Sequence, residues 1–93
     1  MNTTAHKSND RFVVFTSPAI TEITLKAIQD LDADYSFTVS DIQGKILHTG
    51  TLSQNGNPAS KIDISTYAMG NYYICTQSPK GKIYLNRFIK VNK

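Results

Sequence analysis

Short stretches of alternating apolar and polar residues run along most of this chain, and turn-forming residues separate them about every ten positions. The clearest stretch is residues 35–41, where Tyr35, Phe37 and Val39 alternate with polar residues. Such alternation is typical of a strand with one buried face and one solvated face. No stretch keeps an apolar face at helical spacing over three turns. The pattern therefore predicts an all-β sandwich or barrel.

We expect seven strands, joined mostly by hairpins, that form the two antiparallel sheets of an immunoglobulin-like β-sandwich. They are predicted at residues 11–15, 22–28, 35–41, 45–52, 61–65, 71–78 and 82–91. Gly50 lies inside the fourth stretch and suggests a bulge or a strong twist there. Residues 1–10 are polar and show no periodicity, so we interpret them as a flexible linker and residues 11–93 as the sandwich domain.

Two hairpin turns have recognisable chemistry. In "DIQG", Asp41 can accept hydrogen bonds from the backbone amides that follow it, and Gly44 tolerates the left-handed conformation that closes a hairpin. In "SPKGK", Pro79 suits the second position of a turn and Gly81 the fourth. Both segments are predicted to connect neighbouring antiparallel strands.

Charge is distributed unevenly along the 93 residues, whose length fits one small domain. The net charge is +3, and the last fourteen positions contain five basic residues and no acidic residue. These are Lys80, Lys82, Arg87, Lys90 and Lys93. Such an asymmetry indicates an acidic partner, a nucleic acid or a membrane surface. The polar N-terminus is not a secretory signal, and no apolar run is long enough to be a transmembrane segment.

Several motifs, in the order in which they occur, resemble the C-terminal sorting domain of the type IX (Por) secretion system of Bacteroidetes. The segments are "VSDIQGKILHTG", "IDISTYAMGNYYICTQSPKGK" and "RFIKVNK". The positions that fall on the family pattern are Asp41, Gly44, Lys45, Ile62, Ile64, Gly70, Tyr72, Phe88, Ile89 and Lys90. The resemblance covers roughly residues 11–93. It departs at residues 16–18, where Thr-Ser-Pro replaces the usual Pro-Asn-Pro.

The resemblance implies a sorting signal rather than an enzyme. Similar domains sit at the C-terminus of cargo proteins, which pass through the periplasm and are then secreted or held at the cell surface. The implied partners are the outer-membrane translocon, a sortase-like peptidase and an N-terminal cargo domain. The chain is then either an excised domain or a very short cargo, and the missing signal peptide favours excision.

We expect the translocon to recognise the folded domain non-covalently, through its last hairpin. Lys80, Lys82, Arg87, Lys90 and Lys93 are expected to supply charge, while Phe88 and Ile89 hold the strand in place. A purely structural interpretation is that lysines on a terminal strand deter aggregation between sheet edges. Recognition by strand addition at that edge is compatible with it. Nucleic-acid binding is disfavoured, because the rest of the domain has little positive charge.

No combination of residues indicates catalysis or a metal site. Cys75 has His6 and His48 as possible basic partners, and these do not form a convincing set of nucleophile, base and orienting group. We expect Cys75 to be a small packing residue or a half-exposed thiol. The sequence therefore predicts no enzyme activity and no cofactor.

The acidic segment from Asp30 to Asp34 resembles the start of a calcium loop, and Asp41 falls at the twelfth position. However, Tyr35 stands where such a loop needs glycine, so we favour a solvated hairpin and no metal.

The positions of the tyrosines suggest an alternative function, that of an immunoglobulin-like adhesion or carbohydrate-binding module. Tyr73 and Tyr84 occur on neighbouring predicted strands, and a pair of exposed tyrosines would suit glycan stacking. Tyr72 follows Gly70 by two positions and is expected to be a corner tyrosine, with its ring packed and its hydroxyl bonded to nearby backbone.

Overall fold

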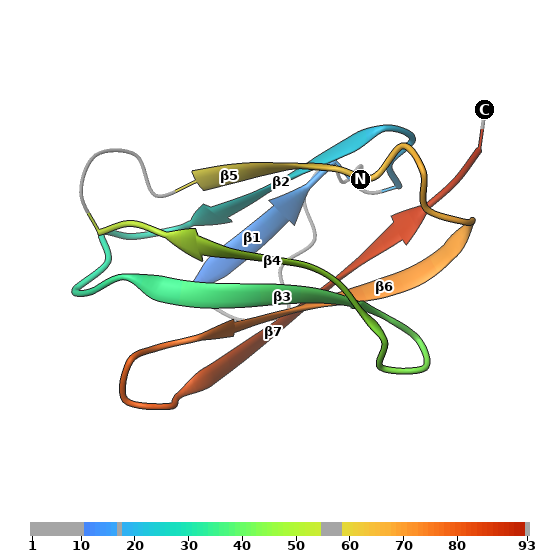
Figure 1. The fold of residues 1–93 in the computed structure, drawn as a ribbon. Coiled ribbons are helices and arrows are strands. Elements are labelled where there is room, and N and C mark those ends of the chain that lie inside the picture. The colour runs from blue at the N-terminus through green and yellow to red at the C-terminus, as the bar shows by residue number, and fades with distance from the viewer. Residues whose placement is uncertain (1–10, 17, 55–58, 93) are drawn as a thin grey trace.

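Two sheets packed face to face make up the structure, a computed structural model that describes residues 11–16, 18–54 and 59–92 (Figure 1). Within these residues there are seven strands and no helix. The strands are β1 (Phe12–Phe15), β2 (Glu22–Ala27), β3 (Tyr35–Asp41), β4 (Ile46–Leu52), β5 (Ala59–Asp63), β6 (Gly70–Gln77) and β7 (Ile83–Lys90). The predicted seven-stranded antiparallel sandwich is confirmed. The predicted linker, residues 1–10, lies outside the described residues.

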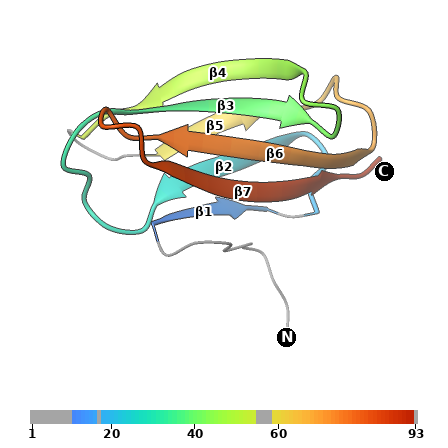
Figure 2. The ribbon, with the colours of Figure 1, turned by 90° about the horizontal axis from the view of Figure 1, so that it is seen from below.

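The strand order places the last strand at an edge. One sheet, here called the β1 sheet, has the order β1-β2-β5, and the other, the β7 sheet, has the order β4-β3-β6-β7. Neighbouring strands within each sheet are antiparallel. Figure 2 shows β1 and β7 along the same side of the sandwich. The first and last strands therefore meet across the gap between the sheets.

Alternate side chains of both sheets fill the space between them. Phe12 and Val14 of β1 are fully buried, and Phe37, Ile74 and Phe88 of the β7 sheet face them from the other layer. Aromatic contacts run through this core, including a stacked pair of Tyr72 and Phe88 with ring centroids 5.3 Å apart. Burial of a large apolar side chain is worth about 1.5–3 kcal/mol, so these residues supply most of the driving force for folding.

Hydrogen bonds to the segment after β1 close the sandwich at the C-terminal end of β7. The backbone N–H of Ala19 donates to the carbonyl of Ile89 at 2.9 Å, and the N–H of Val91 donates to the carbonyl of Ala19 at 2.9 Å. This pairing makes a parallel bridge between Ala19 and Lys90. Part of the outer edge of β7 is therefore already occupied by the chain itself.

Gly50 does not mark the bulge that the sequence suggested. It lies opposite Phe37 in the β3–β4 register, and the register shift falls instead between Val39 and Ser40. A Cβ atom at Gly50 would lie 2.5 Å from Cζ of Phe37. The glycine is therefore needed for space, because the ring of a core phenylalanine covers it.

Replacing this glycine tests the close contact. We expect Gly50→Ala to lower the free energy of unfolding by about 1–3 kcal/mol, because the buried Phe37 ring must move out of a well-packed position. Urea denaturation measures the change. Thr51→Ala, at the exposed neighbouring position, is the control and should stay within about 0.5 kcal/mol of the unsubstituted chain. An equal loss in both variants would contradict the packing argument.

Candidate recognition surface on the last strand

The last strand buries two polar side chains beside its aromatic ones and exposes its aliphatic side chains. Its inward positions are Tyr84, Asn86, Phe88 and Lys90, and all four are buried. Its outward positions include Ile83, Leu85 and Ile89, which are 58%, 53% and 40% exposed. Hydrophobicity alone does not decide between the two faces, because the observed one buries Tyr84 and Phe88 together with an amide and an ammonium group, whereas the other would bury three aliphatic side chains together with Arg87.

Two buried polar side chains fix this orientation. Asn86 donates from Nδ2 to the backbone carbonyl of Phe12 at 3.1 Å. Lys90 is only 3% exposed, and its Nζ donates to the carbonyl of Ile20 at 2.5 Å. Buried polar groups need such partners, and a one-residue shift of β7 would remove both bonds and bring Phe88 to the surface. The bonds to the start of the chain therefore explain why the aliphatic residues face outward.

The β6–β7 hairpin displays two lysines at one end of this strand. Ser78 N–H donates to the carbonyl of Lys82 at 2.9 Å, and Gly81 N–H donates to the carbonyl of Ser78 at 2.9 Å. The Ser78 hydroxyl accepts the N–H of Lys82 at 3.0 Å, and Gly81 has a φ of 94°. The predicted turn at residues 78–82 is confirmed, and both Lys80 and Lys82 are exposed.

The β3–β4 hairpin has the same construction at the other end of the sheet. Gly44 N–H donates to the carbonyl of Asp41 at 3.0 Å, and Gly44 has a φ of 90°. The Asp41 Oδ1 accepts the N–H groups of Gln43 and Lys45, each at 2.9 Å. The expected role of the aspartate is thus confirmed, and it corresponds to that of Ser78 in the last hairpin.

The five basic residues predicted for recognition do not form one surface cluster. Lys80, Lys82 and Arg87 are exposed. Lys90 is buried, so the expectation that it supplies surface charge is wrong. Its ammonium group instead donates a hydrogen bond to the Ile20 carbonyl. Lys93 lies outside the described residues.

Phe88 and Ile89, the two apolar positions assigned to holding the strand, lie on opposite faces. Phe88 is fully buried, whereas the Ile89 side chain is exposed and its backbone carbonyl accepts the Ala19 N–H. Ile83 and Leu85 were not among the residues predicted to form the site. The signal that could have identified them is the phase of the alternation in "IYLNRFIK", which places both on the same face as Arg87.

The corner tyrosine is confirmed. Gly70 begins β6 with a φ of 147°, and two residues later the Tyr72 hydroxyl donates to the carbonyl of Ala68 at 2.5 Å. The Tyr72 ring also lies against Tyr67, with ring centroids 5.1 Å apart. This tyrosine therefore anchors the entry to β6 and is not available as a ligand platform.

The expected pairing of Tyr73 and Tyr84 on one face is wrong. Tyr84 faces the core, where its ring lies 5.4 Å from Phe12 and 6.3 Å from Tyr35. Tyr73 lies on the opposite, outward face of the sheet and pairs in register with Arg87. The two tyrosines cannot form a common stacking surface, which removes the observation that favoured carbohydrate binding.

The acidic residues between Asp30 and Asp34 that resemble the start of a calcium loop make separate hydrogen bonds. Asp32 Oδ1 accepts the Tyr35 hydroxyl at 3.2 Å, and Asp34 Oδ1 accepts the N–H of Gln54 at 2.9 Å. Among the described residues, no cluster of three or more His, Cys, Asp or Glu side chains could hold a metal ion. Cys75 is half-buried and lies opposite Leu85 on the outward face.

Comparisons with known proteins agree with this architecture. The sequence matches the family described as "Secretion system C-terminal sorting domain" over residues 13–91. The chain belongs to this family. It is therefore a C-terminal sorting domain of type IX secretion. No curated protein matches the chain significantly.

A solved structure with the same fold is a DUF3244 family protein with an immunoglobulin-like β-sandwich from Bacteroides vulgatus. The TM-score is 0.72 at 18% identity, and the match covers 94% of the sorting domain and 91% of that chain. This likeness shows the fold. In the part of the sorting domain that the structure describes, no helix is long and apolar enough to cross a membrane.

The buried lysine provides a test of the strand's orientation. We expect Lys90→Ala to lower the free energy of unfolding by about 1–3 kcal/mol, because the Ile20 carbonyl loses its donor and the buried aliphatic stem is removed. Chemical denaturation of the whole chain measures the change. Lys61→Ala on β5, where the lysine is exposed, is the matched control. Equal stability of the two variants would contradict a structural role for Lys90.

Proposed function

We propose that the folded sandwich, residues 11–93, is the sorting signal that directs an N-terminal cargo domain through the outer-membrane translocon. The cargo passes through the periplasm in transit and is then secreted or held at the cell surface. Recognition is non-covalent, so the domain acts as a sorting signal and needs no catalytic group or cofactor. A sortase-like peptidase acts on the cargo after recognition. Family membership supports the sorting role, and the surface of β7 supports the mode of recognition.

The observation that carries the mode of recognition is the outward face of β7, defined here as Ile83, Leu85, Arg87 and Ile89. Large aliphatic side chains gathered on an exposed strand mark a contact site for another protein, because water contact disfavours them. Full burial of such a side chain is worth about 1.5–3 kcal/mol, and a partner that covers one already half-buried gains roughly half of that. The face therefore offers enough apolar surface for a specific but reversible contact.

Charge beside this face indicates the chemistry of the partner. Arg87 lies between Leu85 and Ile89 along the outward face, and Lys80 and Lys82 lie at the hairpin end. A translocon surface with an apolar centre and acidic margins is complementary to this arrangement. Charge complementarity of this kind raises the association rate and sets the orientation of docking.

Side-chain contact fits the structure better than strand addition along the whole edge. The pairing of Ala19 with Ile89 and Val91 already uses the backbone groups at the C-terminal end of β7. A partner strand could not pair continuously there without displacing that segment. The outward side chains, in contrast, are accessible while the sandwich remains folded.

A reporter fusion tests the sorting role. Residues 11–93 are fused to the C-terminus of a periplasmic reporter in a Bacteroidetes host that has a type IX system. We expect the reporter to reach the cell surface or the medium, and to remain periplasmic in a strain without the translocon. A reporter that stays periplasmic in the host, while an established sorting domain exports it, would contradict the proposal.

Substitutions on the outward face test the mode of recognition. We expect Ile83→Ser combined with Leu85→Ser to reduce export of the fusion about tenfold or more, because two apolar contacts with the partner are lost. Ile28→Ser, at an exposed position just after β2, is the control and should not reduce export. Circular dichroism and denaturation confirm that both variants fold. Unchanged export by the folded β7 variant would exclude this face as the contact.

A further inference from the structure

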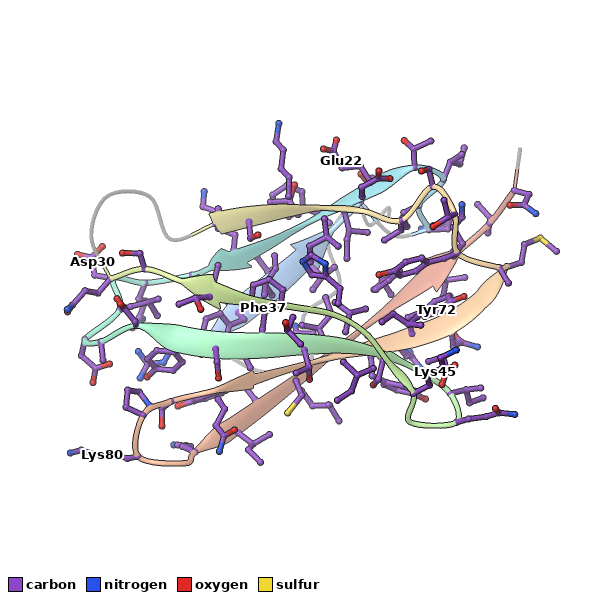
Figure 3. The ribbon with its side chains drawn as sticks, viewed as in Figure 1. Glu22, Asp30, Phe37, Lys45, Tyr72 and Lys80 are labelled. Atoms are coloured by element: carbon purple, nitrogen blue, oxygen red, sulfur yellow. The ribbon has the colours of Figure 1, made fainter. Side chains whose placement is uncertain are left out.

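A pocket of about 450 Å³ lies where the β6–β7 hairpin meets the start of β1 and the connection between β2 and β3. The residues that matter for its chemistry are Arg11, Asp32, Tyr35, Lys80, Lys82 and Tyr84. Figure 3 shows Lys80 on the hairpin at this end of the molecule and Lys45 at the opposite end. The pocket therefore joins basic groups from the two ends of the sequence and is separate from the outward face of β7.

Two of these basic groups converge on one aromatic ring. The Arg11 guanidinium carbon lies 5.8 Å from the centroid of the Tyr84 ring, and Lys82 Nζ lies 5.4 Å from it. Cation–π attraction favours each contact separately. Both positive charges therefore border the same ring, and each attracts an anion that enters the pocket beside it.

The acidic group of the pocket offsets only part of this charge. Asp32 Oδ1 accepts a hydrogen bond from the Tyr35 hydroxyl at 3.2 Å, so part of the carboxylate is already engaged. Lys80 adds a third positive charge to those of Arg11 and Lys82. The pocket lining therefore carries an excess of positive charge, together with aromatic walls from Tyr35 and Tyr84.

We propose that this pocket binds a carboxylate carried on a short aliphatic stem. Guanidinium and ammonium groups form charge-assisted hydrogen bonds with a carboxylate. The tyrosine rings and Pro79 give the stem an apolar wall, which a bare inorganic anion would not use. An acidic side chain of a polypeptide and a free dicarboxylic acid both have this chemistry. The site does not depend on the sorting role.

Titration of the full 93-residue chain tests the site at constant ionic strength. The probes are glutarate, an acetylated and amidated Glu-Glu dipeptide, and inorganic phosphate, followed by amide chemical shifts. We expect saturable shifts confined to residues around Arg11, Ala33 and Lys80 to Lys82, with a Kd on the order of 1 mM or below for a carboxylate probe. Tighter binding of the dipeptide identifies a polypeptide as the source, and equal or tighter binding of glutarate identifies a free acid. Both outcomes support the site.

Charge variants make the test specific. Lys82→Gln should weaken glutarate binding about fivefold or more, because a charge-assisted contact is lost. Asp32→Asn should strengthen it, because the opposing carboxylate is removed. Lys45→Gln, at the far end of the sheet, should leave it unchanged. Absence of localised saturable shifts, binding of phosphate alone, or equal weakening by Lys45→Gln would overturn the proposal. Export of the corresponding fusions is measured separately, so failure of the pocket leaves the sorting role intact.

Discussion

The hydrogen bonds that join β7 to the beginning of the chain determine most of what this domain presents to a partner. Asn86 reaches the Phe12 carbonyl and Lys90 reaches the Ile20 carbonyl, so both side chains must face inward. Successive residues of a strand point to opposite faces, and Ile83, Leu85 and Ile89 are therefore turned outward. The recognition surface is therefore a consequence of this pairing across the sandwich, together with the burial of Tyr84 and Phe88 on the same inward face.

The same contacts stabilise the domain and hold the outward face of β7 at the surface. A chain that buried its aliphatic residues on β7 would leave Asn86 and Lys90 in water and the carbonyls of Phe12 and Ile20 without their present donors. A buried acceptor without a partner costs about 1–3 kcal/mol, which is a large fraction of the stability of a small domain. The pairing of Ala19 with the end of β7 adds backbone bonds at the same place. Loss of the docked last strand would thus remove the outward face and the core together.

Sequence reasoning predicted the elements that follow from local chemistry. Alternation located all seven strands to within two residues at each end, and the turn residues Asp41, Gly44, Pro79 and Gly81 predicted both hairpins. Family motifs added the sorting role, which alternation could not supply. The predictions that failed concern contacts between distant segments. The alternative of an exposed pair of Tyr73 and Tyr84 fails because Tyr84 packs against Phe12 and Tyr35, which lie far away in the sequence. The charge of Lys90 favoured a role in recognition. The sequence pattern could not show that its ammonium group binds the Ile20 carbonyl, because that partner lies seventy residues earlier.

The central claim is that the translocon contacts the outward face of β7 while the domain is folded. Site-specific photo-cross-linking during export tests this most directly, with the photoreactive residue placed at Leu85 and, as the control, at Thr51 on the outward face of β4. The account predicts a cross-link from position 85 to an outer-membrane component and a much weaker one from position 51, in fusions that are both exported. Equal cross-links from the two positions, or none from position 85 in an exported fusion, would contradict it.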